Sequence, residues 1–290
     1  MQVIFEDGQT RLKGVEHFDL AATLDCGQAF RFEQEEPGRW RGIIGRREIT
    51  LFHDGKDILL SPCTRADYEG FYENYFDLKT DYSAIQRALS KDRYVGRGIA
   101  YAPGLRILNQ DPYETVISFL ISQNNNIKRI KRIIQNLAQR AGKRLASGHA
   151  FPTVEALAGL EEEELLALGT GYRAKYILGT ARRLAEGFCL ESLRDMPYQA
   201  AKEQLMTLPG VGPKVADCIL LFSLGHRESF PVDTWVKKAL CNIYPECCAK
   251  DAQKVMMEKF GNLAGYANHY LFHCIRNMGE ERFFAQEEWK

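Results

Sequence analysis

The sequence lacks the marks of several special classes of protein. No apolar run is long enough to cross a membrane, and the N-terminus lacks the basic-then-apolar pattern of a signal peptide. The eight cysteines form no spaced CxxC pairs, and the group at Cys241, Cys247 and Cys248 matches neither ferredoxin-type spacing. We therefore expect an intracellular protein with free thiols, no metal site and no cofactor.

Net charge is also absent, because 38 Lys and Arg residues balance 38 Asp and Glu residues. A neutral chain is on average a poor nonspecific binder of polyanions. The charge is nevertheless uneven, since residues 115–154 contain no acid and seven bases: Lys128, Arg129, Lys131, Arg132, Arg140, Lys143 and Arg144. A local basic face is what contact with phosphate requires. The alternative is a solvated helix face, for which a complete lack of acids is unusual.

Length and residue pattern divide the chain. A chain of 290 residues is too long for one small core and indicates two or three packed units. From Tyr68 onward the pattern is helical, so we expect a sheet domain with short helices over residues 1–103 and a helical domain over residues 104–290. Within the first domain, alternating segments between turn signals predict antiparallel strands at residues 1–5, 26–32, 40–44, 48–52 and 57–60.

A glycine-bearing turn at residues 208–218 predicts a hairpin between two helices. Gly210 and Gly212 let the backbone turn sharply and approach a neighbour, and Pro213 suits the first position of a helix. The backbone N–H groups at that helix N-terminus form an anion site that suits a phosphate. Lys214 lies in the same first turn, where the helix dipole disfavours its charged form. The alternative is an ordinary turn with an exposed lysine, and this stretch alone does not decide between the two.

Other polar turns also have two interpretations. Three consecutive asparagines at residues 124–126 end one predicted helix, and Asn126 is suited to cap the next. Their amides, together with Arg129, suit contacts with base edges, or they form an ordinary polar turn between helices. Tyr172 and Arg173, at a glycine-rich turn, suit insertion into a base stack or an ordinary helix end.

Single residues at element ends give further hints. Asp111 and Asp233 each precede a predicted helix and are strong N-caps. In the last predicted helix, Asn268 and Phe272 are four positions apart and therefore face the same way. Gly27 stands where a strand would begin, and the residues alone favour a turn glycine over a carbonyl offered to a ligand.

These stretches together resemble the helix-hairpin-helix DNA glycosylase superfamily, and within it the 8-oxoguanine DNA glycosylase family. The resemblance covers nearly the whole chain and implies an α+β fold, in which an N-terminal antiparallel β-sheet domain packs on a mostly α-helical core. The helix-hairpin-helix of that core would span residues 198–224. Seven motifs stand in the family's order: DCGQAF (residues 25–30), QDP (110–112), SQNNN (122–126), GYR (171–173), LPGVGPKVADC (208–218), PVD (231–233) and ANHYLF (267–272).

The resemblance also implies a bifunctional DNA glycosylase/AP lyase that acts in base excision repair on 8-oxoguanine opposite cytosine. Such an enzyme flips the damaged nucleotide into a pocket. The Lys214 amine then attacks the anomeric carbon and displaces the base, a Schiff base forms, and β-elimination nicks the strand 3′ to the lesion. Asp233 would orient the site and stabilise positive charge on the sugar. The similar methylpurine glycosylases lack this lysine.

The same match implies the residues of the base pocket. Gly27 corresponds to the glycine whose carbonyl accepts the N7–H of 8-oxoguanine, while Cys218 and Phe272 correspond to the two residues that sandwich the base. Three positions depart from the family's pattern: Asn268 replaces a glutamine that reads the base edge, Phe222 a methionine of the pocket wall, and Trp235 a phosphate-binding histidine. Because asparagine is one methylene shorter than glutamine, Asn268 would need a water or a shifted base to make this contact.

The remaining matches concern contacts with duplex DNA that contains 8-oxoguanine, the expected partner of this chain. The protein would act as a monomer. Asn124 would fill the vacated stack and contact the orphaned cytosine, which Arg129 and Arg173 would also read. Tyr172 would be the wedge. Such a protein would work at the nucleoid in a bacterial cytoplasm, or in a nucleus. Phosphate would be held by the backbone N–H groups of Gly210, Gly212 and Val215.

Two alternatives remain open. One is a glycosylase for another modified purine, such as an alkylated one. The other is a noncatalytic DNA-binding protein that uses the hairpin only for phosphate. That protein would have no reason to combine Lys214 with Asp233 nineteen positions later.

Overall fold

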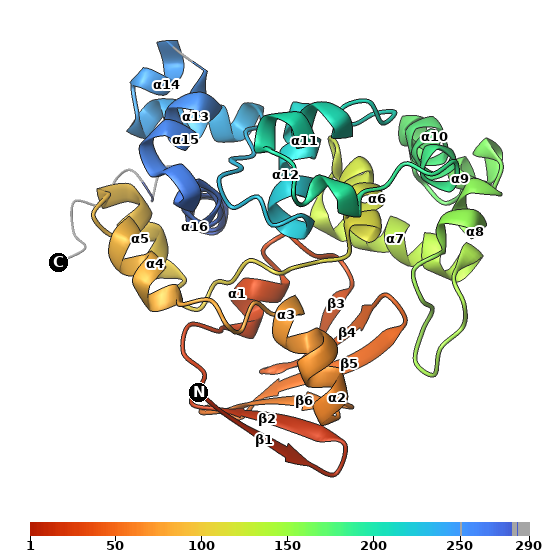
Figure 1. The fold of residues 1–290 in the computed structure, drawn as a ribbon, viewed down its shortest axis with the longest axis horizontal. Helices are drawn as coiled ribbons and strands as arrows, with labels where there is room; N and C mark the ends of the chain where they lie inside the picture. Colours follow the sequence, from red (N-terminus) through yellow and green to blue (C-terminus); the bar gives the residue numbers. More distant parts are fainter. Residues whose placement is uncertain (250, 280–282, 284–290) are drawn as a thin grey trace.

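The computed structural model describes residues 1–249, 251–279 and 283, apart from the side chains of residues 234 and 235. The expectation for Trp235 therefore lies outside the described residues. Figure 1 shows a sheet in the lower part of the molecule and a helical body above it. Among the described helices, none has both the length and the apolar character needed to cross a membrane.

The N-terminal part is a six-stranded antiparallel sheet in the order β1-β2-β6-β5-β4-β3. The prediction for residues 26–32 is wrong, because β3 begins only at Phe32 and Gly27 has a φ of +94°, which a strand does not adopt. The other predicted strands are confirmed, and the mostly polar β2 was not predicted. The bounds are β1 (Gln2–Glu6), β2 (Gln9–Lys13), β3 (Phe32–Glu36), β4 (Arg39–Ile44), β5 (Arg47–His53) and β6 (Ile58–Ser61).

The sheet has an apolar core of its own. Side chains of the strands, such as Trp40 and Leu51, are buried in one cluster with Tyr72 and Phe76 from the segment that follows the sheet. The aromatic residues Tyr72 and Phe76 of that segment are therefore core residues. The elements that join this cluster are α1 (Leu20–Leu24), η1 (Tyr68–Tyr72) and α3 (Glu73–Tyr75), while α2 (Arg65–Asp67) has no buried residue and leads into η1.

The rest of the chain is helical, which confirms the α+β class. The two central helices, α6 and α12, are buried along most of their length, and the rings of Phe119 and Phe222 stack between them with centroids 5.6 Å apart. The helices are α4 (Tyr82–Leu89), α5 (Arg93–Tyr101), α6 (Pro112–Ser122), α7 (Ile127–Ala141), α8 (Val154–Ala158), α9 (Glu162–Ala167), α10 (Ala174–Ala185), α11 (Tyr198–Leu205), α12 (Pro213–Ser223), α13 (Thr234–Ile243), α14 (Glu246–Ala249), α15 (Ala252–Phe260) and α16 (Ala264–Met278), with short 3-10 turns η2 (Gly171–Arg173), η3 (Glu191–Leu193) and η4 (Gly261–Leu263).

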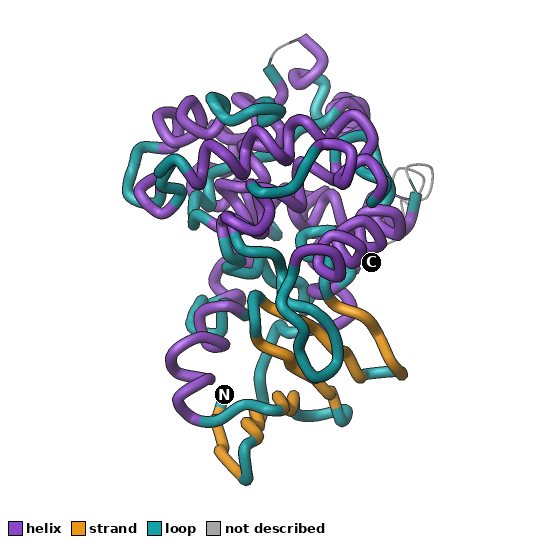
Figure 2. Tube along the Cα trace, turned by 90° about the vertical axis from the view of Figure 1, so that its right-hand side faces the viewer, coloured by secondary structure: helices purple, strands orange, loops and turns teal. Residues whose placement is uncertain are grey.

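Helices α4 and α5 precede residue 103 but share the core of the helical body. Tyr82 and Ile99 are buried in the same apolar cluster as Tyr270 of α16, and the ring of Tyr82 meets that of Tyr266 edge-on at 5.7 Å. Figure 2 shows most of the helices above the strands in a view turned by 90°. The division of the chain at residue 103 stays a prediction.

Three predicted N-caps fix where the central helices begin. The side chain of Asp111 accepts from the Glu114 N–H at 2.8 Å, and that of Asn126 accepts from the Arg129 N–H at 3.0 Å. Asp233 does the same for α13, because its Oδ1 accepts from the Val236 N–H at 2.7 Å. These caps confirm the predicted helix starts and orient the segments that lead into them.

The cysteines differ in one respect from the prediction of free thiols. Cys241 of α13 and Cys248 of α14 form a disulfide, and their Cα atoms are 5.1 Å apart. The seven-residue spacing gave no sign of this pair because the turn between the two helices brings it together. The other six cysteines are free, and all of these except Cys189 are buried.

Candidate active site

A small cavity lies where α12, α16, the loop around Gly27 and the segment before α13 meet. Residues from both ends of the sequence contribute to its walls. The lining includes Cys26, Gln28, Phe119, Pro231, Val236 and His269. The fold therefore brings together every residue that the sequence predicted for catalysis and base binding: Lys214, Asp233, Gly27, Cys218, Phe222, Asn268 and Phe272.

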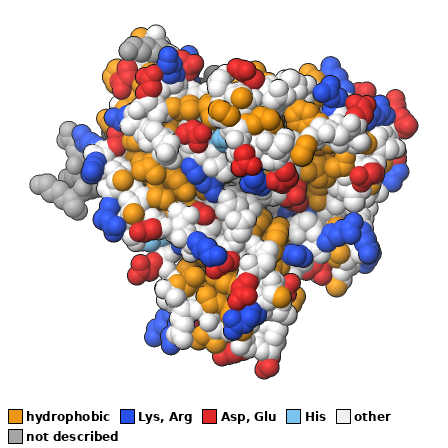
Figure 3. Space-filling model, in the orientation of Figure 1, with side chains coloured by type: hydrophobic (Ala, Val, Ile, Leu, Met, Phe, Trp, Pro, Cys, Tyr) orange, Lys and Arg blue, Asp and Glu red, His pale blue; other side chains and the backbone are white. Residues whose placement is uncertain are grey.

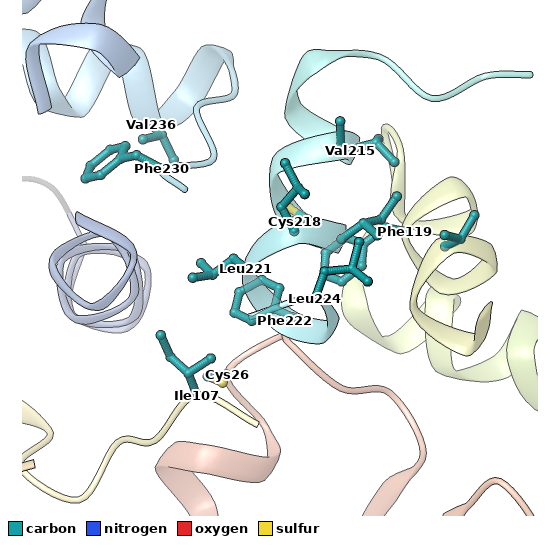
Figure 4. Close-up of a cluster of buried hydrophobic side chains, with 14 of the residues drawn as sticks. Cys26, Ile107, Phe119, Val215, Cys218, Leu221, Phe222, Leu224, Phe230 and Val236 are labelled. Carbon is teal, nitrogen blue, oxygen red and sulfur yellow. The ribbon is translucent and has the colours of Figure 1, made fainter. Parts of the chain in front are cut away.

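Helix α12 forms the first wall. Lys214 is half-buried in its first turn, and its Nζ lies 5.3 Å from the centroid of the Phe119 ring. Cys218 is buried one turn later, and Figure 4 shows it on α12 together with Phe222. Burial raises the pKa of the Cys218 thiol to about 11, although the Lys214 charge opposes this shift. The thiol is thus neutral at physiological pH and offers a soft apolar surface beside the amine.

The hairpin (residues 208–218) places Lys214 with only one glycine in a left-handed conformation. Gly210 has a φ of +78°, and a Cβ there would lie 2.5 Å from Cγ of Tyr176, so glycine is required. Gly212 has a φ of −91° and open space where a Cβ would be, so it needs no glycine for its backbone. Gly212 is instead the N-cap residue of α12, and Val215 lies buried in the first turn.

The segment that carries Asp233 is tied to α12 by a buried polar network. Lys202 of α11 donates to Asp217 Oδ2 at 2.9 Å. Gln253 of α15 donates through the same amide nitrogen to Asp217 Oδ2 at 2.5 Å and to the carbonyl of Phe230 at 2.8 Å. Burial raises the pKa of Asp217, and the Lys202 charge opposes the shift. The network therefore fixes the segment that leads to Asp233 against the helix that carries Lys214.

The Gly27 loop (residues 25–31) forms the second wall and has no regular secondary structure. A Cβ on Gly27 would lie 3.0 Å from Cδ1 of Ile127 and 3.1 Å from Nη1 of Arg276. Together with its φ of +94°, this close packing explains why glycine stands at this position. The glycine is thus more than an ordinary turn residue, because helices α7 and α16 both press against it.

Helix α16 forms the third wall. The Asn268 amide donates to the Pro231 carbonyl at 3.0 Å, and the half-buried Phe272 follows one turn later. His269, which the sequence did not single out, is buried with its Nε2 3.7 Å from Cys26 Sγ. Burial lowers the pKa of His269 to about 3, so the ring is neutral. A histidine on a buried helix has no pattern that separates a pocket residue from a core residue.

Two turns, at residues 122–126 and 169–173, lie beside the hairpin and are bonded to each other. Asn124 has a φ of +48°, and Gln123 beside it donates to the Gly210 carbonyl at 3.1 Å. Arg173 is only 3% exposed, and its guanidinium donates to the carbonyls of Gln123, Asn124 and Thr170. In this structure Arg173 therefore holds the asparagine turn rather than presenting free donors. Gln123, which the sequence analysis assigned no role, links this turn to the hairpin.

Two predicted residues are exposed at the same tips. Tyr172 is 52% exposed, and the Arg173 guanidinium lies 4.4 Å from the centroid of its ring. Arg129 is exposed in the first turn of α7, and its Nη2 donates to the Gly169 carbonyl at 3.4 Å. An aromatic ring and a guanidinium are thus presented to solvent next to the hairpin.

Comparison with known proteins agrees with this geometry. Residues 12–116 match the N-terminal domain of 8-oxoguanine DNA glycosylase, and residues 117–266 match the HhH-GPD superfamily base excision DNA repair protein. The N-glycosylase/DNA lyase OGG1 of Arabidopsis thaliana is 34% identical, and the match covers 87% of this chain and 76% of that protein. A probable N-glycosylase/DNA lyase of Methanothermobacter thermautotrophicus is 34% identical over 71% of this chain and 74% of its own length.

A solved structure extends the match to the whole fold. The Clostridium acetobutylicum 8-oxoguanine glycosylase/lyase, in complex with double-stranded DNA containing cytosine opposite 8-oxoG, superposes with a TM-score of 0.92 at 37% identity. The match covers 96% of this chain and 98% of that one. The chain belongs to the 8-oxoguanine DNA glycosylase family. As a member of this family it is an N-glycosylase/DNA lyase.

The basic face of this glycosylase lies on α7. The apolar stripe Ile130, Ile133, Ile134 and Leu137 is buried, while Lys128, Arg129, Arg132 and Arg140 are exposed. Figure 3 shows Lys and Arg side chains gathered at the right of one face of the molecule, in the region of α7 and α8. In the part of the chain that the structure describes, no group of three or more His, Cys, Asp or Glu residues is placed to hold a metal ion.

Proposed function

We propose that this glycosylase/lyase excises 8-oxoguanine opposite cytosine from duplex DNA through a Schiff base on Lys214. The observation that carries the proposal is the single cavity lined by Lys214, Asp233 and the residues that match the family's base pocket. A flipped nucleotide with its base in this cavity would bring its sugar to the lysine. The basic face of α7 and the turn tips beside the hairpin would contact the duplex, which a single copy of the chain would bind.

The chemistry follows from a neutral Lys214 amine at the sugar. The amine attacks C1′, the glycosidic bond breaks, and its electron pair leaves with the base, which takes up a proton. The sugar ring then opens to give the imine on Lys214. Loss of a C2′ proton expels the 3′ phosphate by β-elimination and nicks the strand. Asp233, held by its N-cap bond to Val236, would stabilise the positive charge that develops on the sugar.

Recognition of the base would use all three walls. Cys218 and Phe272 would sandwich the ring, and the Gly27 carbonyl would accept the N7–H that distinguishes 8-oxoguanine from guanine. The Asn268 amide is bound to the Pro231 carbonyl, so in the conformation described it is turned toward the Asp233 segment. We therefore expect Asn268 to read the base edge through a water or after exchanging this bond.

The turn tips would fill the space left by the flipped nucleotide. Asn124 would enter the stack, Tyr172 would wedge beside it, and Arg129 would contact the orphaned cytosine. Arg173 would reach that cytosine only by exchanging bonds that it makes here with backbone carbonyls. The hairpin backbone at Gly210, Gly212 and Val215 would hold a phosphate of the damaged strand.

Borohydride trapping tests the mechanism. Duplexes carrying 8-oxoguanine opposite each of the four bases are incubated with wild type, Lys214→Ala and the matched control Lys79→Ala, whose side chain is 80% exposed on the sheet domain. We expect a covalent adduct and fastest excision opposite cytosine for wild type and control, and no adduct for Lys214→Ala. Base release without an adduct would overturn the lysine mechanism, and equal cleavage opposite all four bases would overturn the cytosine preference.

Asn268→Gln tests the base edge. If Asn268 contacts the lesion through a water, the longer side chain will replace that contact and raise the rate of 8-oxoguanine excision without changing trapping at a preformed abasic site. Unchanged rates for 8-oxoguanine and other modified purines would show that position 268 does not read the base.

A further inference from the structure

The Gly27 loop is held in place by side chains from other parts of the chain. On one side of the glycine, the Gln28 amide donates to the carbonyls of Thr23 and Arg106, each at 2.8 Å, and its Oε1 accepts from the Leu108 N–H at 2.9 Å. The Gln28 carbonyl in turn accepts from Gln110 Nε2 at 2.8 Å. The residue that follows the glycine is thus fixed through both its side chain and its carbonyl.

On the other side of the glycine, the backbone is held by Arg276 alone among the side chains described above. Arg276 Nη1 donates to the Cys26 carbonyl at 2.8 Å, and its Nη2 donates to the Asp25 carbonyl at 3.4 Å. The same Nη1 would lie 3.1 Å from a Cβ on Gly27, so the guanidinium packs against the glycine itself. A planar fork with two donors fixes the direction of successive carbonyls in a way that a single point charge does not.

Arg276 also shares a stripe of α16 with pocket residues. Positions 268, 272 and 276 are spaced by four, so Asn268, Phe272 and Arg276 project from one face of the helix. The amide proposed for the base edge, the ring proposed for stacking and the clamp on the Gly27 loop therefore stand on one rigid element. Nothing in the glycosylase mechanism described above uses Arg276.

We propose that Arg276 is a positioning residue for lesion recognition: its fork fixes the backbone before Gly27 so that the glycine carbonyl is aimed at the N7–H of the flipped base. This inference rests on the proposed function. Glycine has the freest backbone of all residues, so its carbonyl direction depends on how firmly the residues on either side are held. The bonds of its side chain and carbonyl hold Gln28 on one side, and Arg276 holds the Cys26 carbonyl on the other.

The proposal separates two activities of the same enzyme. The Gly27 carbonyl interacts only with a base, so it contributes to excision but has no partner at an abasic site. Loss of the Arg276 fork should therefore slow excision of 8-oxoguanine and leave strand cleavage at a preformed abasic site unchanged. A merely structural role would lower both rates together, because Lys214 serves both reactions.

The test compares single-turnover rates for Arg276→Met, Arg276→Lys and the distant control Arg11→Met, which removes an arginine paired with Asp54 on the sheet. For Arg276→Met we expect about tenfold slower excision opposite cytosine, the loss that one hydrogen bond accounts for, with abasic-site cleavage unchanged within about twofold. Arg276→Lys, which retains a single donor nitrogen and loses the planar fork, should fall between wild type and Arg276→Met. The control should behave as wild type.

Two results would overturn the positioning role: an equal fall in both rates for Arg276→Met, or no fall in excision. Failure of the wild type to excise 8-oxoguanine, with cleavage at abasic sites intact, would instead count against the proposed substrate. The two failures are therefore distinguished by the wild-type rate alone.

Discussion

The hairpin and the Gly27 loop face each other across the cavity, and they are built in opposite ways. The hairpin is a turn between two regular helices, and its shape follows from signals within eleven residues, including Gly210 and Pro213. The Gly27 loop has no regular structure, and its partners stand far away in the sequence. Gln28 reaches Arg106 across 78 positions, and Arg276 reaches Cys26 across 250.

This difference separates the two tasks of the enzyme. In the proposed mechanism the hairpin presents Lys214 for the same reaction whatever the base, and a helix start with a local turn is a stiff support for that. The Gly27 loop would place one carbonyl for one lesion, and it depends on several individual hydrogen bonds. Damage to the hairpin's support should therefore reduce the whole activity, whereas damage to the loop should reduce recognition.

The largest loss of stability is expected for the buried ion pair between Lys202 and Asp217, which supports the hairpin wall. Lys202→Met leaves the Asp217 carboxyl buried without its cation, although Gln253 and Tyr198 still donate to it. We expect a loss of about 3 kcal/mol in the free energy of unfolding, because removing one partner of a buried pair strands the other. Urea unfolding measures this loss.

Lys79→Met, which removes an exposed lysine paired with Glu73, is the control and should change the stability by less than about 1 kcal/mol. If Lys202→Met were no more destabilising than this control, the network would not be what supports the hairpin wall. We also expect trapping and excision to fall by the same factor in Lys202→Met, since both need Lys214.

The second largest loss of stability is expected for the Gly27 loop. Gln28→Ala removes the bonds to the carbonyls of Thr23 and Arg106 and to the Leu108 N–H, all in a buried environment. We expect a loss of about 2–3 kcal/mol in the free energy of unfolding, because these backbone groups then lie buried without partners. Gln34→Ala, an exposed glutamine on β3, is the control. A loss no greater than that of the control would mean that water replaces the Gln28 amide.

The contrast between the two walls also explains what the sequence could predict. The hairpin, the N-caps and the helical body follow from local signals, and the structure bears them out. The Gly27 loop was predicted as a strand because its apolar residues alternate in that way. Its actual conformation is set by contacts with Arg106, Leu108 and Arg276, whose positions become known only when the whole chain is folded. Asp217 and His269 were missed for the same reason.

A third prediction uses the far end of the loop, where Arg31 Nη1 lies 3.9 Å from Glu114 Oε2 on α6. Burial raises the pKa of Glu114 to about 7, although Arg31 opposes the shift and Asp111 adds to it. The folded protein therefore holds this proton more tightly than the unfolded chain does. As the pH rises from about 4.5 to about 7, the unfolded chain loses this proton while the folded protein keeps it, so the free energy of unfolding falls.

Glu114→Gln removes this titration. Relative to wild type, we expect the variant to gain about 2 kcal/mol in the free energy of unfolding between pH 5 and pH 8, measured by urea unfolding at each pH. Glu163→Gln, an exposed carboxylate on α9, should show no such gain. A flat difference between Glu114→Gln and wild type would show that the loop end is not sensitive to pH in this range.

The smallest expected change in stability falls on Gly27 itself, and it separates the loop from the hairpin most sharply. Gly27→Ala places a Cβ at a φ of +94° and against Ile127 and Arg276, so the free energy of unfolding should fall by about 1–2 kcal/mol. Gly225→Ala is the matched control, because Gly225 has a φ of +83° and open space around it. Both variants carry the backbone strain, but only Gly27→Ala displaces the Gly27 carbonyl.

We therefore expect Gly27→Ala alone to slow 8-oxoguanine excision by tenfold or more, roughly the value of one lost hydrogen bond, with cleavage at abasic sites retained. Equal excision by the two alanine variants would show that strain, and not the direction of the Gly27 carbonyl, limits recognition.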